Sequence, residues 1–375
     1  MINFNQPFII GRELEYIHDA VESHKISGDG KYTQLCTGLL QEMLGSRVLL
    51  THSCTAALEM SAMLLNISPG DEVIMPSFTF VSTANAFAVR GAKIRFCDIK
   101  PDTLNIDDRL IPALINSNTK AIVPVHYGGI SCEMDQIKAL ADLNQIAVVE
   151  DAAQALGAMY NKKPLGTLGA LGSLSFHETK NVISGEGGAI IVNDYKYYER
   201  AEIIREKGTN RSKFFRGEVD KYTWVDEGSS YLPSDIIAAY LYAQLENIDK
   251  ITSKRKKIFQ YYHEGLKNAE DSGKLRRPII PQHTDPNYHL YYILLNDSGI
   301  RDKLMYYLRE KNIYSVFHYL PLHQSVYAKK HGLFEGRLPA TENISRRLLR
   351  LPFFYDLDEK AQEKVISTIY SFFEK

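Results

Sequence analysis

The stretch with the clearest chemical potential is "SFHETKN", Ser175 to Asn181, which places one lysine after an apolar run typical of a β-strand. Lys180 is either a solvated surface side chain or a nucleophile that forms a Schiff base with a carbonyl group. The stretch alone is compatible with both interpretations. The residues that follow the neighbouring predicted strands therefore bear on the choice.

Three other predicted strand ends carry groups that suit one ligand. In "HSCTAAL", Thr55 and Ala56 stand where a strand turns into a helix, and a helix N-terminus suits a phosphate, although a plain N-cap is the alternative. In "PSFTF", Phe80 could stack on a flat ring or belong to the core. In "VVEDAAQA", Asp151 and Gln154 follow an apolar strand, and Asp151 is either a helix cap or the partner of a protonated ring nitrogen.

Taken in chain order, these groups form the set that pyridoxal phosphate needs. A lysine forms the Schiff base, and an aspartate keeps the pyridine nitrogen protonated so that the ring acts as an electron sink. Ser175 and the glycine-rich "SGEGGAI" follow the same predicted strand, and glycines let the backbone approach a ligand closely. Lone histidines such as His126 in "HYGG" and His323 in "HYLPLH" lack metal-ligand spacing, and we expect no metal site.

The elements that position these groups alternate between short apolar strands and helices from about residue 47 to residue 193. This rhythm predicts a mostly parallel sheet covered by helices on both faces, with ligands at the carboxyl ends of the strands. Residues 106–117 are expected to form one of the covering helices. After about residue 235 the pattern changes to one long, possibly kinked helix over 234–268, then a strand at 289–296 and two further helices. We therefore predict a large cofactor-binding domain over 1–240 and a smaller α/β domain over 241–375.

Composition narrows the class of protein. The 375 residues carry a formal net charge of −1 and 45% hydrophobic residues, so we expect neither a nucleic-acid partner nor membrane association. We identify no signal peptide and no apolar run long enough to span a bilayer. The four cysteines are irregularly spaced, which favours a reduced cytoplasmic enzyme over a disulfide framework.

Several motifs together resemble those of the DegT/DnrJ/EryC1/StrS sugar-nucleotide aminotransferase family, over nearly the whole chain. The resemblance implies fold type I of the pyridoxal-phosphate-dependent transferases, the fold of aspartate aminotransferase. It is carried by "HSCTAAL", "GDEVIMPSFTFVSTANA", "VPVHYGG", "VVEDAAQALGA", "SFHETKN" and "GEGGAI".

The resemblance also implies individual roles. Lys180 would be the Schiff-base lysine and Asp151 the partner of the pyridine nitrogen, with Gln154 near the ring hydroxyl and Phe80 stacked on the ring. Phosphate contacts would come from Thr55, Ala56 and Ser175. In much of the family an asparagine of the partner subunit also reaches the phosphate, and Ser230 in "GSSYL" stands at its position. The family's homodimer with shared active sites is expected here, with sugar contacts from His126, Arg211, Tyr319 and His323.

The implied reaction converts dTDP-4-dehydro-6-deoxy-D-glucose to dTDP-4-amino-4,6-dideoxy-D-galactose, with L-glutamate as donor and the pyridoxamine form of the cofactor between the two half-reactions. Such a product would serve a surface polysaccharide resembling enterobacterial common antigen. Alternatives within the class are the 4-amino gluco epimer and a 3-amino-3,6-dideoxy sugar.

Three other classes of protein fit the sequence less well than an aminotransferase. A pyridoxal-phosphate sugar dehydratase shares the fold, but that branch has histidine at the position of Lys180. A transcription regulator would need a basic DNA-binding module, and residues 1–46 are short and not basic. A non-catalytic structural protein gives no reason for the four strand-end groups to occur together.

Overall fold

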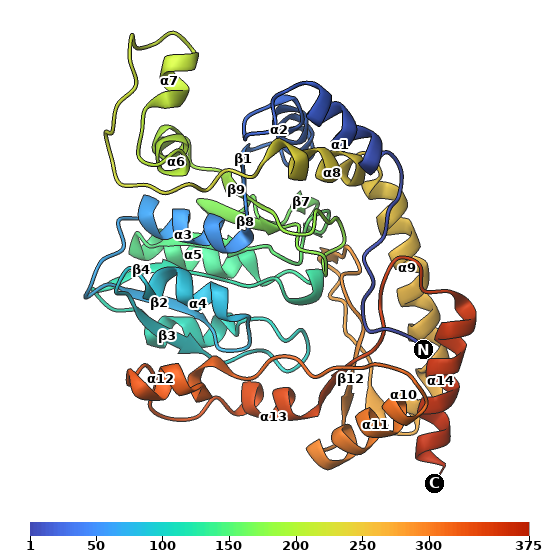
Figure 1. Ribbon diagram of the computed structural model, residues 1–375. Coiled ribbons are helices and arrows are strands. Elements are labelled where there is room, and N and C mark those ends of the chain that lie inside the picture. The colour runs from blue at the N-terminus through green and yellow to red at the C-terminus, as the bar shows by residue number, and fades with distance from the viewer. Residues whose placement is uncertain (375) are drawn as a thin grey trace.

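A seven-stranded sheet forms the centre of the protein, and the computed structural model describes residues 1–374 (Figure 1). The strand order is β1-β9-β8-β5-β4-β2-β3, and every neighbouring pair is parallel except those made by β9. The predicted mostly parallel sheet is confirmed. Its strands are β1 (Arg47–Thr51), β2 (Glu72–Pro76), β3 (Lys93–Cys97), β4 (Thr119–Ile122), β5 (Ala147–Asp151), β8 (Leu171–Ser175) and β9 (Gly188–Val192).

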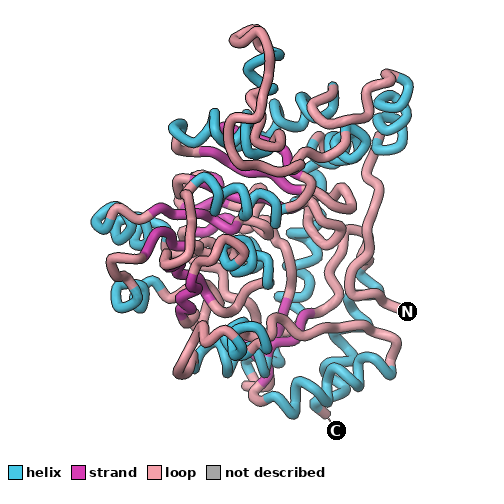
Figure 2. The backbone as a smooth tube through the Cα atoms, turned by 60° about the vertical axis from the view of Figure 1, so that its left-hand side comes forward, coloured by secondary structure: helices cyan, strands magenta, loops and turns pink. Residues whose placement is uncertain are grey.

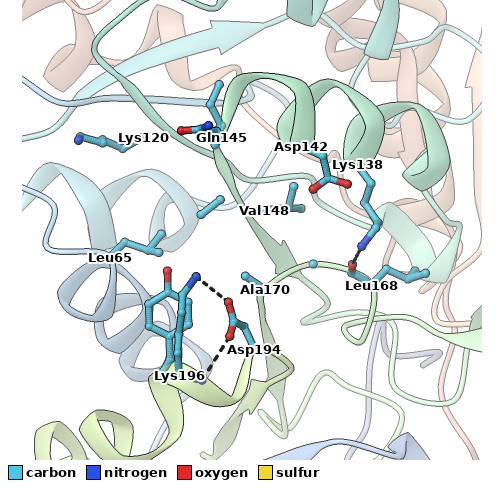
Figure 3. A pocket seen from close by; sticks show the side chains of 14 residues that line it. Leu65, Lys120, Lys138, Asp142, Gln145, Val148, Leu168, Ala170, Asp194 and Lys196 are labelled. Carbon is cyan, nitrogen blue, oxygen red and sulfur yellow. Dashed lines mark hydrogen bonds and ion pairs between the residues drawn. The ribbon is translucent and has the colours of Figure 1, made fainter.

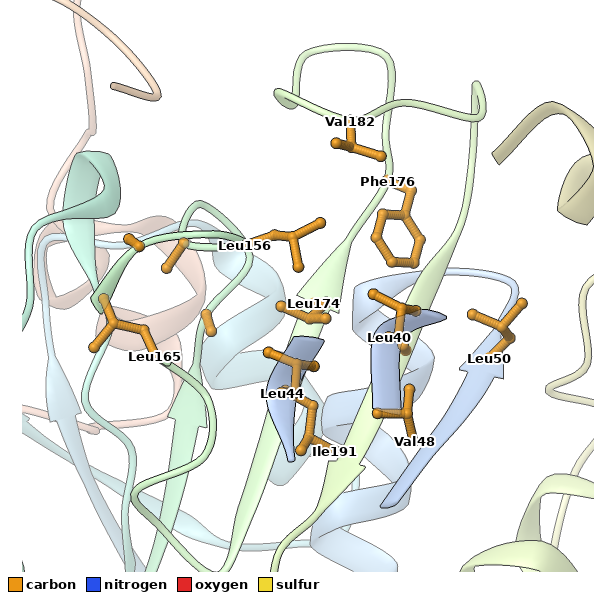
Figure 4. Packing of buried hydrophobic residues seen from close by; sticks show 14 of the residues in the cluster. Leu40, Leu44, Val48, Leu50, Leu156, Leu165, Leu174, Phe176, Val182 and Ile191 are labelled. Carbon is orange, nitrogen blue, oxygen red and sulfur yellow. The ribbon is translucent and has the colours of Figure 1, made fainter. Parts of the chain in front are cut away.

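Helices cover both faces of this sheet because the strands are apolar on both sides. Val48 and Leu50 of β1 pack on one face with Leu40 and Leu44 of α2, as Figure 4 shows, whereas Leu49 belongs to the opposite face. The first face is covered by α1 (Glu13–Glu22), α2 (Lys31–Leu44), α5 (Met134–Asn144) and α8 (Asp235–Leu245), and the second by α3 (Cys54–Leu64), α4 (Val81–Ala88) and α6 (Tyr198–Arg205).

The C-terminal part is built on a second sheet with the order β10-β12-β13, packed against long helices (Figure 1). The chain start joins this part, because Ile2 exchanges backbone hydrogen bonds with Asn312 and Tyr314. The boundary between residues 240 and 241 stays a prediction. The elements are α9 (Ile248–Gly265), α10 (Lys267–Asp271), β10 (Leu275–Arg276), β12 (Tyr292–Leu295), α11 (Ser298–Glu310), α13 (Pro339–Arg347), β13 (Leu348–Arg350) and α14 (Glu359–Phe373).

Two predicted helices differ from the structure. The helix expected over 106–117 is a 3₁₀ segment, η1 (Asp108–Leu114), which contains Pro112 and therefore lacks one of the backbone donors that an α-helix needs. The long helix expected over 234–268 is divided between α8 and α9 at Asn247, whose side-chain amide caps the carbonyl of Ala243. Short elements complete the chain: β6 (Met159–Tyr160), β7 (Lys163–Pro164), β11 (Thr284–Asp285), α7 (Arg211–Phe215) and α12 (Val326–Lys330), with the 3₁₀ turns η2 (Tyr127–Gly129), η3 (Tyr195–Tyr197) and η4 (Leu322–Gln324).

Within residues 1–374, no helix is both long and apolar enough to cross a membrane.

Candidate active site

Lys180 lies on the connection between β8 and β9, at the carboxyl edge of the large sheet. The connection is a tight, hydrogen-bonded loop: Phe176 donates its N–H to Gly187 at 2.8 Å, and Glu178 donates to Gly185 at 2.9 Å. The N–H of Lys180 itself donates to the carbonyl of His177 at 2.9 Å. The loop therefore holds the lysine backbone in place and leaves its side chain half-buried beside the strand ends.

Asn181 anchors this loop to the C-terminal part of the chain. Its side-chain amide donates to the carbonyl of Asn287 at 2.7 Å, and its oxygen accepts from Nδ1 of His289 at 2.9 Å. Arg255, which is buried, donates in turn to the carbonyl of His289 at 2.6 Å. The role of Asn181 could not be predicted from the motif "SFHETKN", in which it directly follows Lys180.

The surroundings of Lys180 favour its neutral amine. Burial lowers the pKa of Lys180, Arg350 acts in the same direction, and Asp151 opposes it. Burial, with Asp151 adding to it, raises the pKa of the Cys54 thiol to about 12, so this thiol stays protonated near neutral pH. A lysine with a lowered pKa is a better nucleophile and a better proton acceptor near neutral pH.

Asp151 ends β5, next to β8 in the sheet, and is 5% exposed. Its Oδ2 accepts a hydrogen bond from the hydroxyl of Thr83 at 2.7 Å, and its Oδ1 accepts from the N–H of Ala153 at 3.2 Å. Each carboxylate oxygen can accept a further hydrogen bond, because it has a second lone pair. A buried carboxylate held in this way is suited to pair with a protonated ring nitrogen.

The N-terminus of α3 forms a cradle at the same edge. Ser53 caps the helix by accepting from the N–H of Ala56 at 3.1 Å, and the hydroxyl of Thr55 donates to Ser82 at 2.8 Å. The strand register brings Ser175 opposite Gly188, and Gly188 opposite the last residue of β1. A Cβ on Gly188 would lie 2.4 Å from the backbone of Ser53, so this approach requires glycine.

An aromatic and an amide face the ends of β2 and β5. Phe80 stands at the N-cap position of α4 and is 57% exposed, and its ring centroid lies 6.4 Å from that of Tyr319. Gln154 donates from Nε2 to the Tyr319 hydroxyl at 3.0 Å and accepts at Oε1 from the N–H of Gly128 at 2.7 Å. The exposed ring and the fixed amide can hold the face and the edge of a flat heterocycle.

These groups fit pyridoxal phosphate in kind and in arrangement. The N-terminus of α3, with the hydroxyls of Thr55 and Ser175, would hold the phosphate, since helix N-termini bind anions. Asp151 would meet the pyridine nitrogen, Gln154 the ring edge and Phe80 the ring face. Within residues 1–374 no cluster of three or more potential metal ligands occurs.

Two predicted sugar contacts lie inside the protein. His126 is fully buried, with Nε2 paired to Glu150 at 2.9 Å and Nδ1 accepting from the N–H of Cys132 at 3.2 Å. His323 is 6% exposed, and its Nδ1 lies 2.7 Å from the Ser77 hydroxyl. Both rings therefore have internal partners, whereas the Tyr319 hydroxyl contacts Gln154 at the site.

Arg211 and Ser230 belong to a segment over 206–230 that stands out from the body of the chain. In Figures 1 and 2 its short helix α7 projects beyond α6, away from the strand ends. Arg211 lies 3.5 Å from Glu206 within the same segment and stacks over Phe215 at 5.1 Å, and Ser230 is exposed. Within residues 1–374, neither residue forms a hydrogen bond or ion pair with Lys180.

A cavity of about 420 Å³ lies at the opposite end of the strands (Figure 3). It is lined by residues at the starts of β4 and β5, including Lys120 and Ala147, and by Lys138 of α5. Ligands of open α/β sheets bind at the carboxyl ends of the strands. We therefore place the active site beside Lys180 and not in this cavity.

The fold and the site define a pyridoxal-phosphate-dependent aminotransferase of fold type I. The profile of the DegT/DnrJ/EryC1/StrS aminotransferase family matches residues 7–370, and the chain belongs to this family. An uncharacterized protein of Methanocaldococcus jannaschii is 34% identical over 97% of this chain and 95% of its own length. The pleiotropic regulatory protein of Geobacillus stearothermophilus is 37% identical over 84% of this chain and 82% of its own length.

Solved structures support the same family and fold. The aminotransferase TlmJ of Streptoalloteichus hindustanus superposes with a TM-score of 0.91 at 30% identity, over 100% of this chain and 99% of its own. A putative sugar aminotransferase of Streptococcus pneumoniae in its PMP form gives a TM-score of 0.93 at 25% identity, with the same coverage. The PLP form of that protein gives a TM-score of 0.92 over 100% of this chain and 98% of its own. The predicted family, fold class and pyridoxal-phosphate cofactor are confirmed.

Proposed function

We propose that this protein is a sugar-nucleotide aminotransferase that moves the amino group of L-glutamate to C4 of dTDP-4-dehydro-6-deoxy-D-glucose, giving dTDP-4-amino-4,6-dideoxy-D-galactose. The observation that carries the amino-transfer part is the position of Lys180, on a fixed loop between the α3 cradle and Asp151. The motif resemblance supports the choice of sugar, and sugar aminotransferases among the structural relatives support the substrate class.

Different side chains of the protein would carry out different parts of the reaction. Bound pyridoxal phosphate supplies an electron sink and carries the amino group between substrates. Asp151 holds a proton at the ring nitrogen, and the α3 N-terminus with Thr55 and Ser175 binds the phosphate. Nζ of Lys180 takes the proton from the α-carbon of the donor and later delivers one to C4 of the sugar on one face. A desolvated amine with a lowered pKa is suited to both transfers.

The substrate end of the site is proposed to need a second copy of the chain. The segment over 206–230 exposes Phe215, Trp224 and Tyr222, which are 68%, 78% and 52% exposed. Exposed aromatics on one segment favour a protein interface. In a homodimer, Ser230 would contact the phosphate of the partner's cofactor and Arg211 the diphosphate of its substrate, because an arginine fork matches phosphate oxygens.

A cytoplasmic location belongs to the same proposal. All four cysteines are free thiols, and three of them are buried. Free thiols are typical of proteins that work in a reducing compartment. The role in a surface polysaccharide resembling enterobacterial common antigen rests on the motif resemblance.

The experiment is a single incubation followed by NMR of the sugar product. The purified holoenzyme with L-glutamate and dTDP-4-dehydro-6-deoxy-D-glucose should give a 4-amino sugar with a small H3–H4 coupling, which marks an axial amine and the galacto product. A large H3–H4 coupling would identify the gluco epimer, and nitrogen on C3 would identify a 3-aminotransferase. Loss of a hydroxyl without incorporation of nitrogen would instead identify a dehydratase.

A further inference from the structure

Two buried threonines form a chain of hydrogen bonds that ends on Asp151. The hydroxyl oxygens of Thr79 and Thr83 lie 2.8 Å apart, and the Thr83 hydroxyl donates to Oδ2 of Asp151 at 2.7 Å. Both threonine side chains are buried. Thr79 lies in the turn between β2 and α4, and Thr83 lies within α4. The chain therefore connects the segment after β2 with the carboxylate at the end of β5.

The direction of this chain follows from the number of protons. A threonine hydroxyl has a single proton, and an ionised carboxylate can only accept hydrogen bonds. Since Thr83 donates its proton to Asp151, its oxygen can only accept from the hydroxyl of Thr79. Both hydroxyl dipoles therefore point toward the carboxylate. Hydrogen bonds aligned in series in this way strengthen one another in the low-dielectric interior of a protein.

Two other buried threonines donate to aspartates, and both pairs have a structural role. The Thr33 hydroxyl donates to Asp235 at 2.8 Å, and the Thr341 hydroxyl donates to Asp98 at 2.7 Å. In each pair the aspartate also accepts the backbone N–H of the same threonine, at 2.8 Å. These aspartates thus satisfy N–H groups in the first turns of α2 and α13, which the helices themselves leave without acceptors.

The pair of Thr83 and Asp151 has no such role in capping a helix. The N–H of Thr83 donates to the carbonyl of Phe80 at 3.2 Å and not to the aspartate. Within residues 1–374 the carboxylate of Asp151 accepts hydrogen bonds only from the Thr83 hydroxyl and the N–H of Ala153, and it forms no ion pair. The hydroxyl chain therefore acts on a buried charge that awaits a cationic partner.

We propose that Thr79 and Thr83 keep Asp151 ionised and in one orientation, so that the ring nitrogen of bound pyridoxal phosphate holds the proton between them. This inference deepens the proposed function and rests on it, because it assumes that Asp151 meets that nitrogen. A hydrogen bond donated to a carboxylate stabilises its charged form. Thr83 and Ala153 each engage one carboxylate oxygen, which fixes the rotation of the group. Thr83 is thus a positioning residue that acts through Asp151.

The test reads the protonation state of the ring nitrogen directly. Each holoenzyme is reconstituted with pyridoxal phosphate that carries an isotopic label on its ring nitrogen, and the chemical shift of this nitrogen is measured by solid-state NMR. The wild type and Thr83→Ser, which keeps the hydroxyl, should give the shift of a protonated pyridine. Thr83→Val keeps the shape of the side chain without the hydroxyl and should move the shift toward that of a neutral pyridine. Thr79→Val should move it less, because it removes only the more distant hydroxyl.

The donor half-reaction gives a second readout. Loss of the cofactor's visible absorption band is followed after mixing with L-glutamate. The maximal rate should fall about 10- to 100-fold in Thr83→Val, because a hydrogen bond to a charged group is lost and the electron sink is weakened. The half-saturating glutamate concentration should stay within about twofold of the wild-type value, since the substrate contacts are unchanged.

Thr341→Val is the matched control, because it removes the same kind of buried bond to an aspartate elsewhere in the chain. It should lower the free energy of unfolding about as much as Thr83→Val does, yet leave the nitrogen shift and the maximal rate unchanged. An unchanged shift in Thr83→Val, or a displacement of the same size in Thr341→Val, would overturn the inference. Should Thr83→Val not retain the cofactor, Thr79→Val decides, and an unchanged shift in it would then overturn the inference.

Asp151→Asn separates this inference from the proposed function. Its ring nitrogen should give the shift of a neutral pyridine. A protonated nitrogen in Asp151→Asn would contradict the role of Asp151 itself, whereas a neutral nitrogen in Asp151→Asn alone would overturn only the role of the threonines. A wild type that shows the expected shifts but aminates no keto-sugar would contradict the proposed substrate and leave this inference intact.

Discussion

The carboxyl edge of the large sheet and the segment over 206–230 differ in how their functional groups are held. Those at the sheet edge have partners within the chain, whereas those of the segment are largely exposed. At the sheet edge, Asp151, Gln154 and Ser53 all have partners within the chain, and the loop of Lys180 is fixed by backbone hydrogen bonds. In the segment, Arg211 pairs only with its own neighbour Glu206, and Trp224 is 78% exposed. The single chain thus fixes the groups at the sheet edge by itself, whereas the segment exposes groups that the proposed homodimer would bring to the partner's site.

The largest effect is expected at the cofactor end. Lys180→Ala should lower turnover by at least about 10³-fold, because general acid–base catalysis and cofactor attachment are lost together. The measurement is kcat for amino transfer with equal cofactor loading. Lys120→Ala, at the opposite end of the strands, is the control and should keep wild-type activity. Comparable turnover in Lys180→Ala would show that another residue transfers the proton.

The second prediction concerns the protruding segment. Arg211→Ala should be nearly inactive with the nucleotide sugar, yet an exchanged mixture with Lys180→Ala should regain about a quarter of wild-type activity, since half of the dimers then carry one complete site. The mixture is assayed after subunit exchange has been verified by mass. No recovery despite exchange would mean that each site is built from a single chain.

A smaller effect is expected from a substitution beside the cradle at the N-terminus of α3. In Gly188→Ala the added Cβ would meet the Ser53 and Cys54 backbone, so we expect a loss of about 1–3 kcal/mol in the free energy of unfolding, with weaker cofactor binding. Gly38→Ala in α2, where nothing lies within 4 Å of the new Cβ, should gain about 0.5–1 kcal/mol. Denaturant unfolding of both variants makes the comparison. A Gly188→Ala protein of unchanged stability would refute the close approach.

The smallest effect is a shift in pH dependence. Burial and Arg350 lower the pKa of Lys180 and Asp151 raises it, and the neutral amine is the form that reacts with pyridoxal phosphate. The rate of covalent cofactor attachment to the apoenzyme should therefore rise with pH, with its inflection below that of free lysine. Arg350→Gln should move the inflection to higher pH and Asp151→Asn to lower pH, each by about one unit or less. An inflection unaffected by both changes would contradict this electrostatic description.

The sequence predicted which strand-end groups meet at one edge of the sheet better than it predicted the surroundings of the histidines, and the reason is physical. Asp151, Ser175 and Thr55 follow apolar strands of a parallel sheet, whose carboxyl ends meet at one edge, so local pattern was sufficient. His126 could not be assigned in this way. Its ring is buried by Glu150, which also accepts from the N–H groups of Gly166, Leu168 and Gly169, far along the chain.

The electrostatic effect of Arg350 on Lys180 is an example of what spacing along the chain does not reveal. Nothing in its local sequence distinguishes it from the neighbouring Arg346 and Arg347 of α13. Within residues 1–374 it has no ion pair with a carboxylate, and its charge lowers the pKa of Lys180 from the C-terminal sheet. A property that depends on what is missing from three-dimensional surroundings cannot be read from spacing along the chain.

The most direct measurement is chemical trapping of the cofactor bond. Borohydride reduction of the holoenzyme, followed by proteolysis and mass spectrometry, should place the pyridoxyl phosphate label on the peptide that contains Lys180 and on no other. The label should be absent from Lys180→Ala treated in the same way. A label on another lysine of the wild-type protein would contradict the assignment of Lys180 and, with it, the placement of the active site at the carboxyl edge of the sheet.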